Sequence, residues 1–278
     1  SYLKNYGITT LTDADNYLPI ALGTCSVTNL EMTAAYTTFA NKGVYVKPKL
    51  YTKVLDHDGN VILDNTENES TQVIRESTAW LMTSALHTVG TLRNLGFPAD
   101  MYVSGKSGTS QNDFDKWAIG FSGNYTVGVW AGYDSNKSFP KEAGFPYMRI
   151  WKEVLVEANK DVDCSEPLKP TSISAVKVCK DSGLLAVDGL CDSDPRGNRV
   201  ETEYFESGTE PTTACNVHTK VDICATSGEI AGNNCPSYSS VIRIIKDYSS
   251  FNKNSFTIGD EKYAITEEYL NKKCEVHN

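Results

Sequence analysis

The stretch of sequence that decides the fold covers residues 104–133 and reads SGKSGTSQNDFDKWAIGFSGNYTVGVWAGY. Short runs rich in β-branched and aromatic residues alternate here with turn residues, a pattern typical of consecutive strands. We predict strands at about residues 101–107, 117–121 and 125–133, the last two joined by the turn Ser-Gly-Asn at 122–124. An antiparallel sheet is the simplest arrangement of such strands.

Helical patterns lie on both sides of this sheet in the sequence. Apolar residues recur at helical spacing over three segments, at about residues 29–41, 76–89 and 147–159. Thr28 and Glu31 form a capping box at the start of the first helix. A peripheral hairpin is expected around the turn at 56–60. Together these elements predict an α+β domain over residues 1–160, an antiparallel sheet flanked by helices.

A second, β-rich domain is predicted over residues 161–278. It begins with a polar, proline-containing connector at 161–171. An internal repeat follows, because residues 176–191 and 221–235 share a short strand, a Ser-Gly turn, a second short strand and a closing cysteine. Two copies predict a tandem β-module.

Composition narrows the class of protein. The 278 residues carry a net charge of −9 and a sequence pI near 5.0, which argues against nucleic acid as a partner, since phosphate binding needs clustered basic residues. No run approaches the ~20 apolar residues of a membrane span. The first residues look like the last turn of a helix that ends at Gly7, so we expect further chain upstream.

Residues 104–110, Ser-Gly-Lys-Ser-Gly-Thr-Ser, hold the most chemical information. Glycines let a substrate approach a strand closely, an ammonium group supplies a compact charge, and hydroxyls orient a carboxylate. The segment also resembles the end of a phosphate-binding loop, but the first glycine of that motif would fall at Asp100. We therefore exclude a phosphate loop and expect no cofactor.

The residues around this segment resemble the penicillin-binding transpeptidase family over most of residues 1–160. Residues 28–45, from Thr-Asn-Leu-Glu-Met to Asn-Lys-Gly-Val-Tyr, resemble the segment after the second catalytic motif of the family. Lys106-Ser107-Gly108 resembles its third motif, Lys-[Thr/Ser]-Gly, and residues 115–121 and 129–134 resemble the two strands that follow. The run at 206–212 is similar to a segment of bifunctional, class A members.

The resemblance implies a partial serine transpeptidase fold of the β-lactamase type and acyl transfer chemistry. A serine would attack a D-Ala-D-Ala stem peptide and pass the acyl group to a neighbouring peptidoglycan strand, and β-lactam antibiotics would mimic the donor. Lys106 would supply charge beside the nucleophile, and the Thr109 N–H one oxyanion donor. Ser107, Gly108, Thr109 and Ser110 would bind substrate. The resemblance places the protein at the extracellular face of the bacterial membrane, held only by an upstream anchor.

The chain departs from the family pattern at the nucleophile. The family has a Ser-x-x-Lys motif and a Ser-x-Asn motif before the segment at 20–45. Ser1-Tyr2-Leu3-Lys4 matches the first pattern but leaves no room for the second, and 122–124 matches the second inside a hairpin turn. We expect the nucleophile in a missing N-terminal part of the same protein, which would leave this chain inactive alone. A β-lactamase, a carboxypeptidase and a non-catalytic wall-binding module are the alternatives.

Seven of the eight cysteines lie in the last 115 residues. A cell-surface location favours disulfides. The repeat predicts the pairs Cys179–Cys191 and Cys224–Cys235, which leaves no metal site. Zinc held by Cys191, Cys215 and His218 is the alternative, because Cys-x-x-His spacing suits a tetrahedral ion. Trp117 and Trp130 lie on predicted strands, where we expect a buried packing role in the core.

Overall fold

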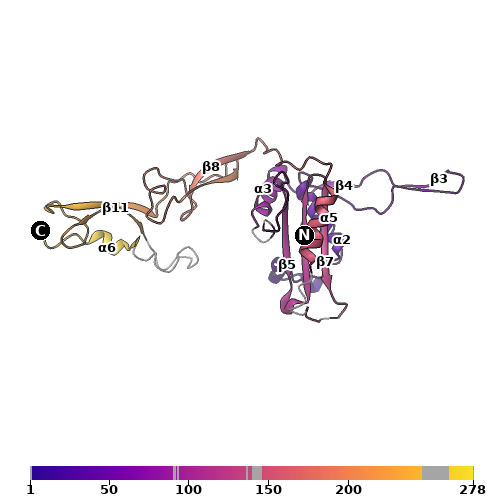
Figure 1. The fold of residues 1–278 in the computed structure, drawn as a ribbon, viewed down its shortest axis with the longest axis horizontal. Coiled ribbons are helices and arrows are strands. Elements are labelled where there is room, and N and C mark those ends of the chain that lie inside the picture. Colours follow the sequence, from indigo (N-terminus) through magenta and orange to yellow (C-terminus); the bar gives the residue numbers. More distant parts are fainter. Residues whose placement is uncertain are drawn as a thin grey trace. The chain divides into compact units, whose positions relative to one another are not determined.

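Figure 1 shows the chain as a computed structural model, which describes residues 2–89, 92, 94–135, 137–139, 146–245 and 263–277. It divides into two compact units, Ser1–Thr171 and Ser172–Asn278. Each unit is described by itself below. The first has the mixed helix and sheet content expected of an α+β domain.

The first unit is built on the predicted antiparallel sheet. Its strands are β5 (Ser104–Thr109), β6 (Asp115–Ser122) and β7 (Tyr125–Gly132), in the order β5-β6-β7. The register sets Gly108 opposite Trp117, and Trp117 opposite Trp130. Strand β5 begins three residues later than predicted, because the Tyr102 N–H donates to the Cys164 carbonyl (2.8 Å) instead of joining the sheet.

Three helices cover the two faces of this sheet. Helices α2 (Asn29–Ala40) and α3 (Glu76–His87) contact one face, and α5 (Tyr147–Ala158) contacts the other. The Ser104 hydroxyl donates to the Thr83 carbonyl of α3 (2.8 Å). On the other face, Trp151 and Leu155 of α5 are fully buried, and the Trp151 indole donates to the Val127 carbonyl (2.9 Å). Residues that alternate along the strands are therefore buried against different helices.

Shorter elements complete the first unit. They are α1 (Tyr2–Asn5), η1 (Asp13–Asp15), η2 (Leu18–Leu22), β1 (Val44–Val46), β2 (Lys53–Leu55), β3 (Val61–Asp64), β4 (Ser70–Gln72) and η3 (Gln111–Asp113). The pairing of β2 with β3 confirms the predicted hairpin, whereas the pairing of β1 with β4 was not predicted. The capping box is confirmed, with the Glu31 N–H donating to Thr28 Oγ1 (3.1 Å) and the Thr28 N–H to Glu31 Oε2 (3.0 Å).

The predicted connector at 161–171 lies within the first unit. The Trp80 indole of α3 donates to the Pro167 carbonyl (3.1 Å), and Cys164 accepts from Tyr102 as described above. These contacts hold the polar segment against the helix and the sheet. The change to the second unit comes after Thr171, eleven residues later than the predicted boundary at 160.

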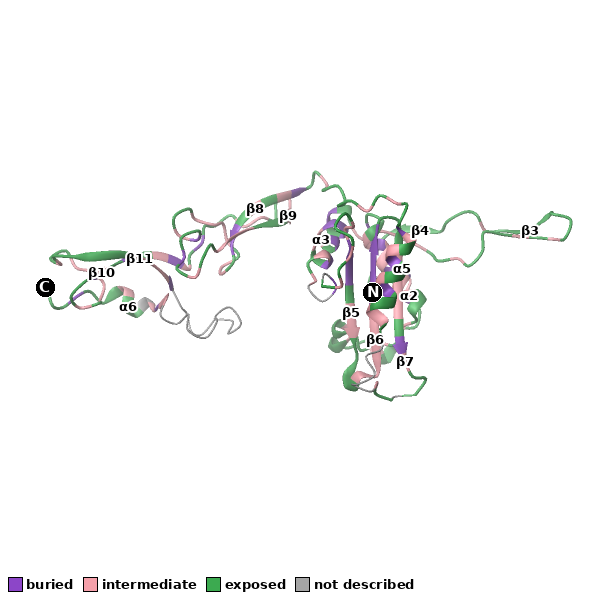
Figure 2. Cartoon of the chain, viewed as in Figure 1, coloured by how far each residue is buried: buried purple, intermediate pink, exposed green. Residues whose placement is uncertain are grey.

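The second unit consists of strands joined by long turns. Its elements are β8 (Ile173–Cys179), β9 (Val200–Glu206), β10 (His218–Cys224), β11 (Tyr238–Ile245), β12 (Ala264–Ile265) and α6 (Glu267–Asn271). Strand β8 pairs with β9, and β11 lies between β10 and β12. The second short strand of each predicted repeat is reduced to a single bridge, at Leu185 and at Ile230. Figure 2 shows exposed and half-buried residues over most of these strands.

The cysteines correct one prediction. All eight lie within the described residues and carry free thiols, so the structure contains neither the Cys179–Cys191 nor the Cys224–Cys235 disulfide. The members of each pair are nevertheless close neighbours. Each pair is joined by a third cysteine and a histidine, so that an odd number of thiols meets in each group.

Candidate functional site

The sequence motif of residues 104–110 lies where the sheet passes from the core to the surface. Ser104 and Gly105 are buried, Ser107 and Gly108 are half-buried, and Lys106 and Thr109 are exposed. The same change along β5 can be followed in Figure 2. The core holds the first part of the strand in place, and the reactive groups extend beyond it toward solvent.

Strand alternation divides these side chains between two faces. Lys106 and Gly108 share the face of Ser104, which α3 covers, whereas Ser107 and Thr109 lie on the opposite face. The Lys106 ammonium donates to the Ser107 carbonyl (2.5 Å). The hydroxyls of Ser107 and Thr109 have no hydrogen-bond partner among the described residues. Two hydroxyls two residues apart are thus left available to one ligand.

The outer edge of β5 pairs with no strand in the described part of the chain. The Ser110 N–H donates to the Asp115 carbonyl (3.1 Å), so residues 110 and 115 form a hydrogen-bonded pair. Such pairs alternate along an antiparallel ladder, which turns the backbone groups of Ser107 and Thr109 away from β6. Their N–H and C=O groups therefore lie along the open edge, on the side where an extended peptide can pair.

Ser110, which we expect to bind substrate, has its hydroxyl engaged within the turn that follows β5. Its hydroxyl donates to Asp115 Oδ2 (2.7 Å) and accepts from the Asp115 N–H (2.8 Å). These bonds close the turn between β5 and β6, in which Asn112 and Asp113 both have a φ of 59°. The structure therefore gives Ser110 a role in holding the turn beside the site.

The two tryptophans of the sheet also differ from expectation. Trp117 and Trp130 lie 6.5 Å apart between ring centroids on the face of Lys106 and Gly108. Trp130 is 39% exposed, and its indole donates to Asp115 Oδ1 (3.0 Å). They pack on each other at the exposed end of the sheet and outside its core. This end of the sheet thus carries an apolar surface next to Gly108.

The described residues of the other serine motifs lie away from this segment. Residues 122–124 form the tight turn between β6 and β7, as predicted, and Ser122 is 2% exposed at the end of β6 remote from Thr109. Ser1 lies outside the described residues. Lys4, its partner in the Ser-x-x-Lys pattern, is exposed in a one-turn helix that Gly7 follows in a left-handed conformation (φ 78°).

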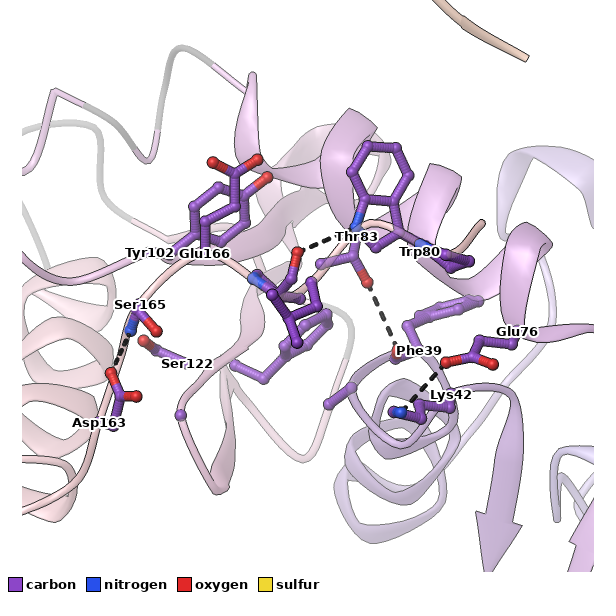
Figure 3. A pocket seen from close by; sticks show the side chains of 16 residues that line it. Phe39, Lys42, Glu76, Trp80, Thr83, Tyr102, Ser122, Asp163, Ser165 and Glu166 are labelled. Carbon is purple, nitrogen blue, oxygen red and sulfur yellow. Dashed lines mark hydrogen bonds and ion pairs between the residues drawn. The ribbon is translucent and has the colours of Figure 1, made fainter. Parts of the chain in front are cut away.

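The first unit also contains a pocket of about 330 Å³, shown in Figure 3. It lies between α2, α3 and the connector, and Phe39, Trp80, Thr83 and Ser122 are among its lining residues. The Lys42–Glu76 ion pair (3.2 Å) stands at its edge. None of residues 104–110 lines it, so this pocket is separate from the candidate site.

The second unit brings together two groups of metal-ligating side chains. Cys179, Cys191, Cys215 and His218 form the first tetrad, and Cys224, Cys235, Cys274 and His277 form the second. The sequence suggested only Cys191, Cys215 and His218 as possible metal ligands, so Cys179 and the whole second tetrad were missed. A usable signal was present, because Cys-x-x-His occurs at 215–218 and again at 274–277.

Comparison with known proteins identifies the first unit. The family described as "Penicillin binding protein transpeptidase domain" matches residues 5–141, and "Penicillin-binding protein 1A, C-terminal domain" matches residues 169–220. The chain belongs to the penicillin-binding protein family. Its first unit is part of a transpeptidase domain, and the C-terminal match agrees with the predicted class A resemblance.

Curated relatives extend the match over the whole chain. Penicillin-binding protein 1A of Clostridium novyi is 30% identical over 289 aligned residues, covering 100% of this chain and 33% of that protein. Penicillin-binding protein 1A of Clostridium perfringens is 35% identical over 197 residues, covering 70% of this chain and 24% of that protein. This penicillin-binding protein chain thus spans a quarter to a third of the length of these relatives.

Solved structures agree on the fold. Penicillin-binding protein 1A from Haemophilus influenzae superimposes with a TM-score of 0.62 at 24% identity, covering 76% of this chain and 36% of that one. The PonA1 protein from Mycobacterium tuberculosis, in complex with penicillin V, gives a TM-score of 0.50 at 22% identity, covering 60% of this chain and 50% of that one. No helix in the described part of the chain is long and apolar enough to cross a membrane.

Proposed function

We propose that the exposed end of β5 is the donor-binding half of a serine D,D-transpeptidase site. The substrate is a peptidoglycan stem peptide that ends in D-Ala-D-Ala, and β-lactam antibiotics bind as mimics of it. The observation that carries this proposal is the pair of hydroxyls, Ser107 and Thr109, which have no hydrogen-bond partner among the described residues and lie on an open strand edge, with the Lys106 ammonium at the Ser107 carbonyl of the same strand.

The geometry suits a peptide that ends in a carboxylate. The two hydroxyls donate to the carboxylate, and such charge-assisted hydrogen bonds are shorter and stronger than neutral ones. Among the described residues, the ammonium of Lys106 donates only to a backbone carbonyl, so it can turn to a substrate without breaking an ion pair. A Cβ at position 108 would lie only 3.3 Å from the Cβ of Trp117. Glycine avoids this close contact and leaves room for a substrate beside the strand.

The acyl transfer step needs an oxyanion site as well as a nucleophile. The outward-facing N–H of Thr109 is a suitable donor to the carbonyl oxygen on which negative charge develops. The serine attacks the carbonyl carbon, D-Ala leaves with a proton, and an amine of a second stem peptide then releases the acyl group. Lys106 stabilises the developing charge during both steps.

The nucleophilic serine is supplied by residues outside this chain, which is inactive alone. This part of the proposal rests on Lys4, which lies exposed in a single helical turn, and on Ser122, which is buried at the end of β6 remote from Thr109. The whole protein acts on the extracellular face of the bacterial membrane. Its class A character implies a membrane anchor and a glycosyltransferase domain in the same polypeptide.

Labelling with a fluorescent penicillin tests the proposal. We expect no adduct on this chain alone, and a stable adduct on a longer protein that includes the serine-bearing part. Lys106→Ala in that protein should slow acylation by about 10²-fold, the scale of losing one group that stabilises charge in acyl transfer. Lys53→Ala on the peripheral hairpin is the matched control and should label at the normal rate.

Three results would contradict the proposal. They are an adduct on Ser1 of the isolated chain, normal labelling of the Lys106→Ala protein, and rapid release of hydrolysed penicillin. The last result would indicate a β-lactamase, because a transpeptidase retains the acyl group.

A further inference from the structure

The second unit has an unusual interior. Its buried cluster consists of Cys179, Cys191 and Cys215, with only small or medium apolar side chains packed around them. Among the described residues of this unit, five of the ten buried apolar residues are cysteines. A unit with so little aliphatic core usually needs disulfides, a metal or a partner for its stability.

The first tetrad has the dimensions of a tetrahedral metal site. All four of its residues are buried, and their ligand atoms lie within 4.8 Å of one another. His218 Nδ1 lies 3.4 Å from Cys179 Sγ and 3.3 Å from Cys215 Sγ. Zinc bonds of ~2.3 Å to sulfur and ~2.05 Å to nitrogen place such atoms about 3.6 Å apart in a tetrahedron. The observed spacing is close to this value.

The imidazole of His218 is held in the orientation that a metal ligand needs. Its Nε2 lies 2.8 Å from Asp194 Oδ2, on the side away from the sulfur atoms. An Nε2–H that donates to this carboxylate leaves Nδ1 unprotonated toward the thiols, an arrangement common behind metal-bound histidines. Arg196 in turn donates to both Asp194 and Asp181, so the buried carboxylates are paired.

The second tetrad repeats this arrangement. His277 Nδ1 lies 3.4 Å from both Cys224 Sγ and Cys274 Sγ, and the four ligand atoms again lie within 4.8 Å of one another. Cys224 and Cys274 are buried at 1% exposure, while Cys235 and His277 are half-buried. Two independent groups in one chain therefore have the same ligand types and the same spacing.

The backbone around the two tetrads is also the same. The Cys215 N–H donates to the Leu185 carbonyl (2.7 Å), and the Cys274 N–H donates to the Ile230 carbonyl (2.8 Å). These bonds make Cys215 and Cys274 equivalent, although the chain between the halves of the site is longer in the second copy. The repeated unit is thus a complete Cys3His group.

Amide hydrogen bonds to sulfur recur as well. The Val187 N–H donates to Cys191 Sγ (3.3 Å), and the Gly232 N–H donates to Cys235 Sγ (3.3 Å). These bonds hold the sulfur atom of Cys191 and that of Cys235 in the same way. The second cysteine of each tetrad therefore has the same backbone support in both copies.

We propose that each tetrad binds one zinc ion, so that the second unit is a tandem of two Cys3His zinc modules. Thiolate and imidazole ligands in a tetrahedron select zinc among the divalent cations that favour such donors. All four positions are filled by protein atoms, so both ions are structural. Strand β10 carries His218 at its start and Cys224 at its end, which places the two ions about 20 Å apart along one strand.

Disulfide formation is the competing chemistry, and the arrangement disfavours it. Each tetrad holds three thiols, so one disulfide would leave a buried cysteine unpaired and a histidine without its ligand. A bound zinc ion uses all four groups of each tetrad at once. With three thiolates and a neutral imidazole as ligands, the zinc site would carry one net negative charge.

Metal analysis tests the proposal on the whole chain, purified without chelators. We expect about two zinc ions per chain and all eight thiols free after denaturation in the presence of a chelator. Cys215→Ser and Cys274→Ser should each remove about one ion, while Cys25→Ser, outside both tetrads, should leave two. Refolding with cobalt should give the visible absorption of a tetrahedral cobalt–thiolate centre.

The cobalt measurement uses the unaltered sequence, so it stays decisive if a serine variant fails to fold. A folded chain with no bound metal would overturn the proposal. Disulfide bonds would also overturn it, and they would appear as an intact mass lower than that of the fully reduced chain by two hydrogens per bond. Retention of both ions in Cys274→Ser would overturn the second site alone.

Discussion

Glu31 shows how one side chain can join separate segments of the first unit. Its carboxylate accepts from the Thr28 N–H at the start of α2 (3.0 Å) and from the Thr9 N–H (2.7 Å), 22 residues earlier in the sequence. Burial acts to raise the pKa of Glu31, but the hydrogen bonds from Thr9 and Thr28 outweigh it and lower the pKa from 4.5 to about 2. The folded state therefore favours the ionised carboxyl group.

We expect Glu31→Ala to lower the free energy of unfolding by about 1 kcal/mol at neutral pH, the usual scale of a lost helix cap after allowance for solvent screening. Because the folded pKa lies below the unfolded one, this stabilisation is complete above pH 4.5 and is lost as the pH falls toward about 2. Chemical denaturation of both proteins at several pH values measures it. Glu69→Ala, at an exposed ion pair with Lys47, should have almost no effect. A difference that grows in acid would contradict this account.

Ser107 and Ser110 are chemically alike, but the structure gives them different roles. In the described part of the chain the Ser107 hydroxyl has no hydrogen-bond partner, whereas the Ser110 hydroxyl donates to Asp115 Oδ2 (2.7 Å). In the longer protein that contains the nucleophile, we expect Ser107→Ala to lower the efficiency of penicillin acylation about tenfold with an unchanged melting temperature. Ser110→Ala should lower the melting temperature. Acylation kinetics and thermal unfolding of both variants separate the two roles, and identical behaviour would refute the assignment.

At the scale of elements, the packing of α5 on the sheet sets the position of β5. Gly120 of β6 lies beneath the Trp151 ring, and a Cβ there would be 2.7 Å from Trp151 Cζ2 and would also overlap the Ser104 carbonyl oxygen. We expect Gly120→Ala to cost about 3 kcal/mol of stability and to move β5 together with Lys106. Denaturant unfolding and penicillin labelling should both be impaired.

The double variant Gly120→Ala, Trp151→Phe tests which of the two overlaps causes the loss of stability. The smaller ring relieves one contact but leaves the backbone overlap with Ser104, so we expect only partial recovery of stability. Full recovery would show that the helix alone resists the added methyl group. No recovery would show that the overlap with the neighbouring strand alone causes the loss of stability.

Elements with a local signal could be predicted from the sequence, and those fixed by distant contacts could not. The capping box at Thr28 marks the start of α2, and the turn at 122–124 fixes the hairpin, because both signals lie within a few residues. The start of β5 was misplaced because Cys164, about 60 residues away, takes the Tyr102 N–H. The pairing of β1 with β4 could not be predicted, because these three-residue strands are separated by the whole β2–β3 hairpin and no short turn joins them.

The candidate sites show the same limit. Lys106 and its neighbours form one continuous motif, so the sequence identified them, but the engagement of Ser110 with Asp115 depends on the conformation of the turn. In the second unit the repeat was visible, yet the third cysteine and the histidine of each group lie far along the chain from the first two cysteines. Only the fold shows that Cys274 and His277 complete the group that Cys224 begins.

At the scale of the whole molecule, the two units should depend on different forces. The first is stabilised by an apolar core around Trp151 and Leu155, and the second by its two tetrads if they bind zinc. The four tryptophans, Trp80, Trp117, Trp130 and Trp151, all belong to the first unit. Tryptophan fluorescence therefore reports on the unfolding of the first unit alone, whereas calorimetry reports on both.

We expect a strong zinc chelator to abolish one calorimetric transition and to leave the fluorescence transition at its original temperature, because metal binding contributes folding free energy only to the unit that holds the ligands. Added zinc should restore the lost transition, whereas added magnesium should not, since it prefers oxygen ligands. A fluorescence transition that moves with the chelator would mean that the two units unfold together. A calorimetric profile that ignores the chelator would mean that the second unit is folded by something other than metal.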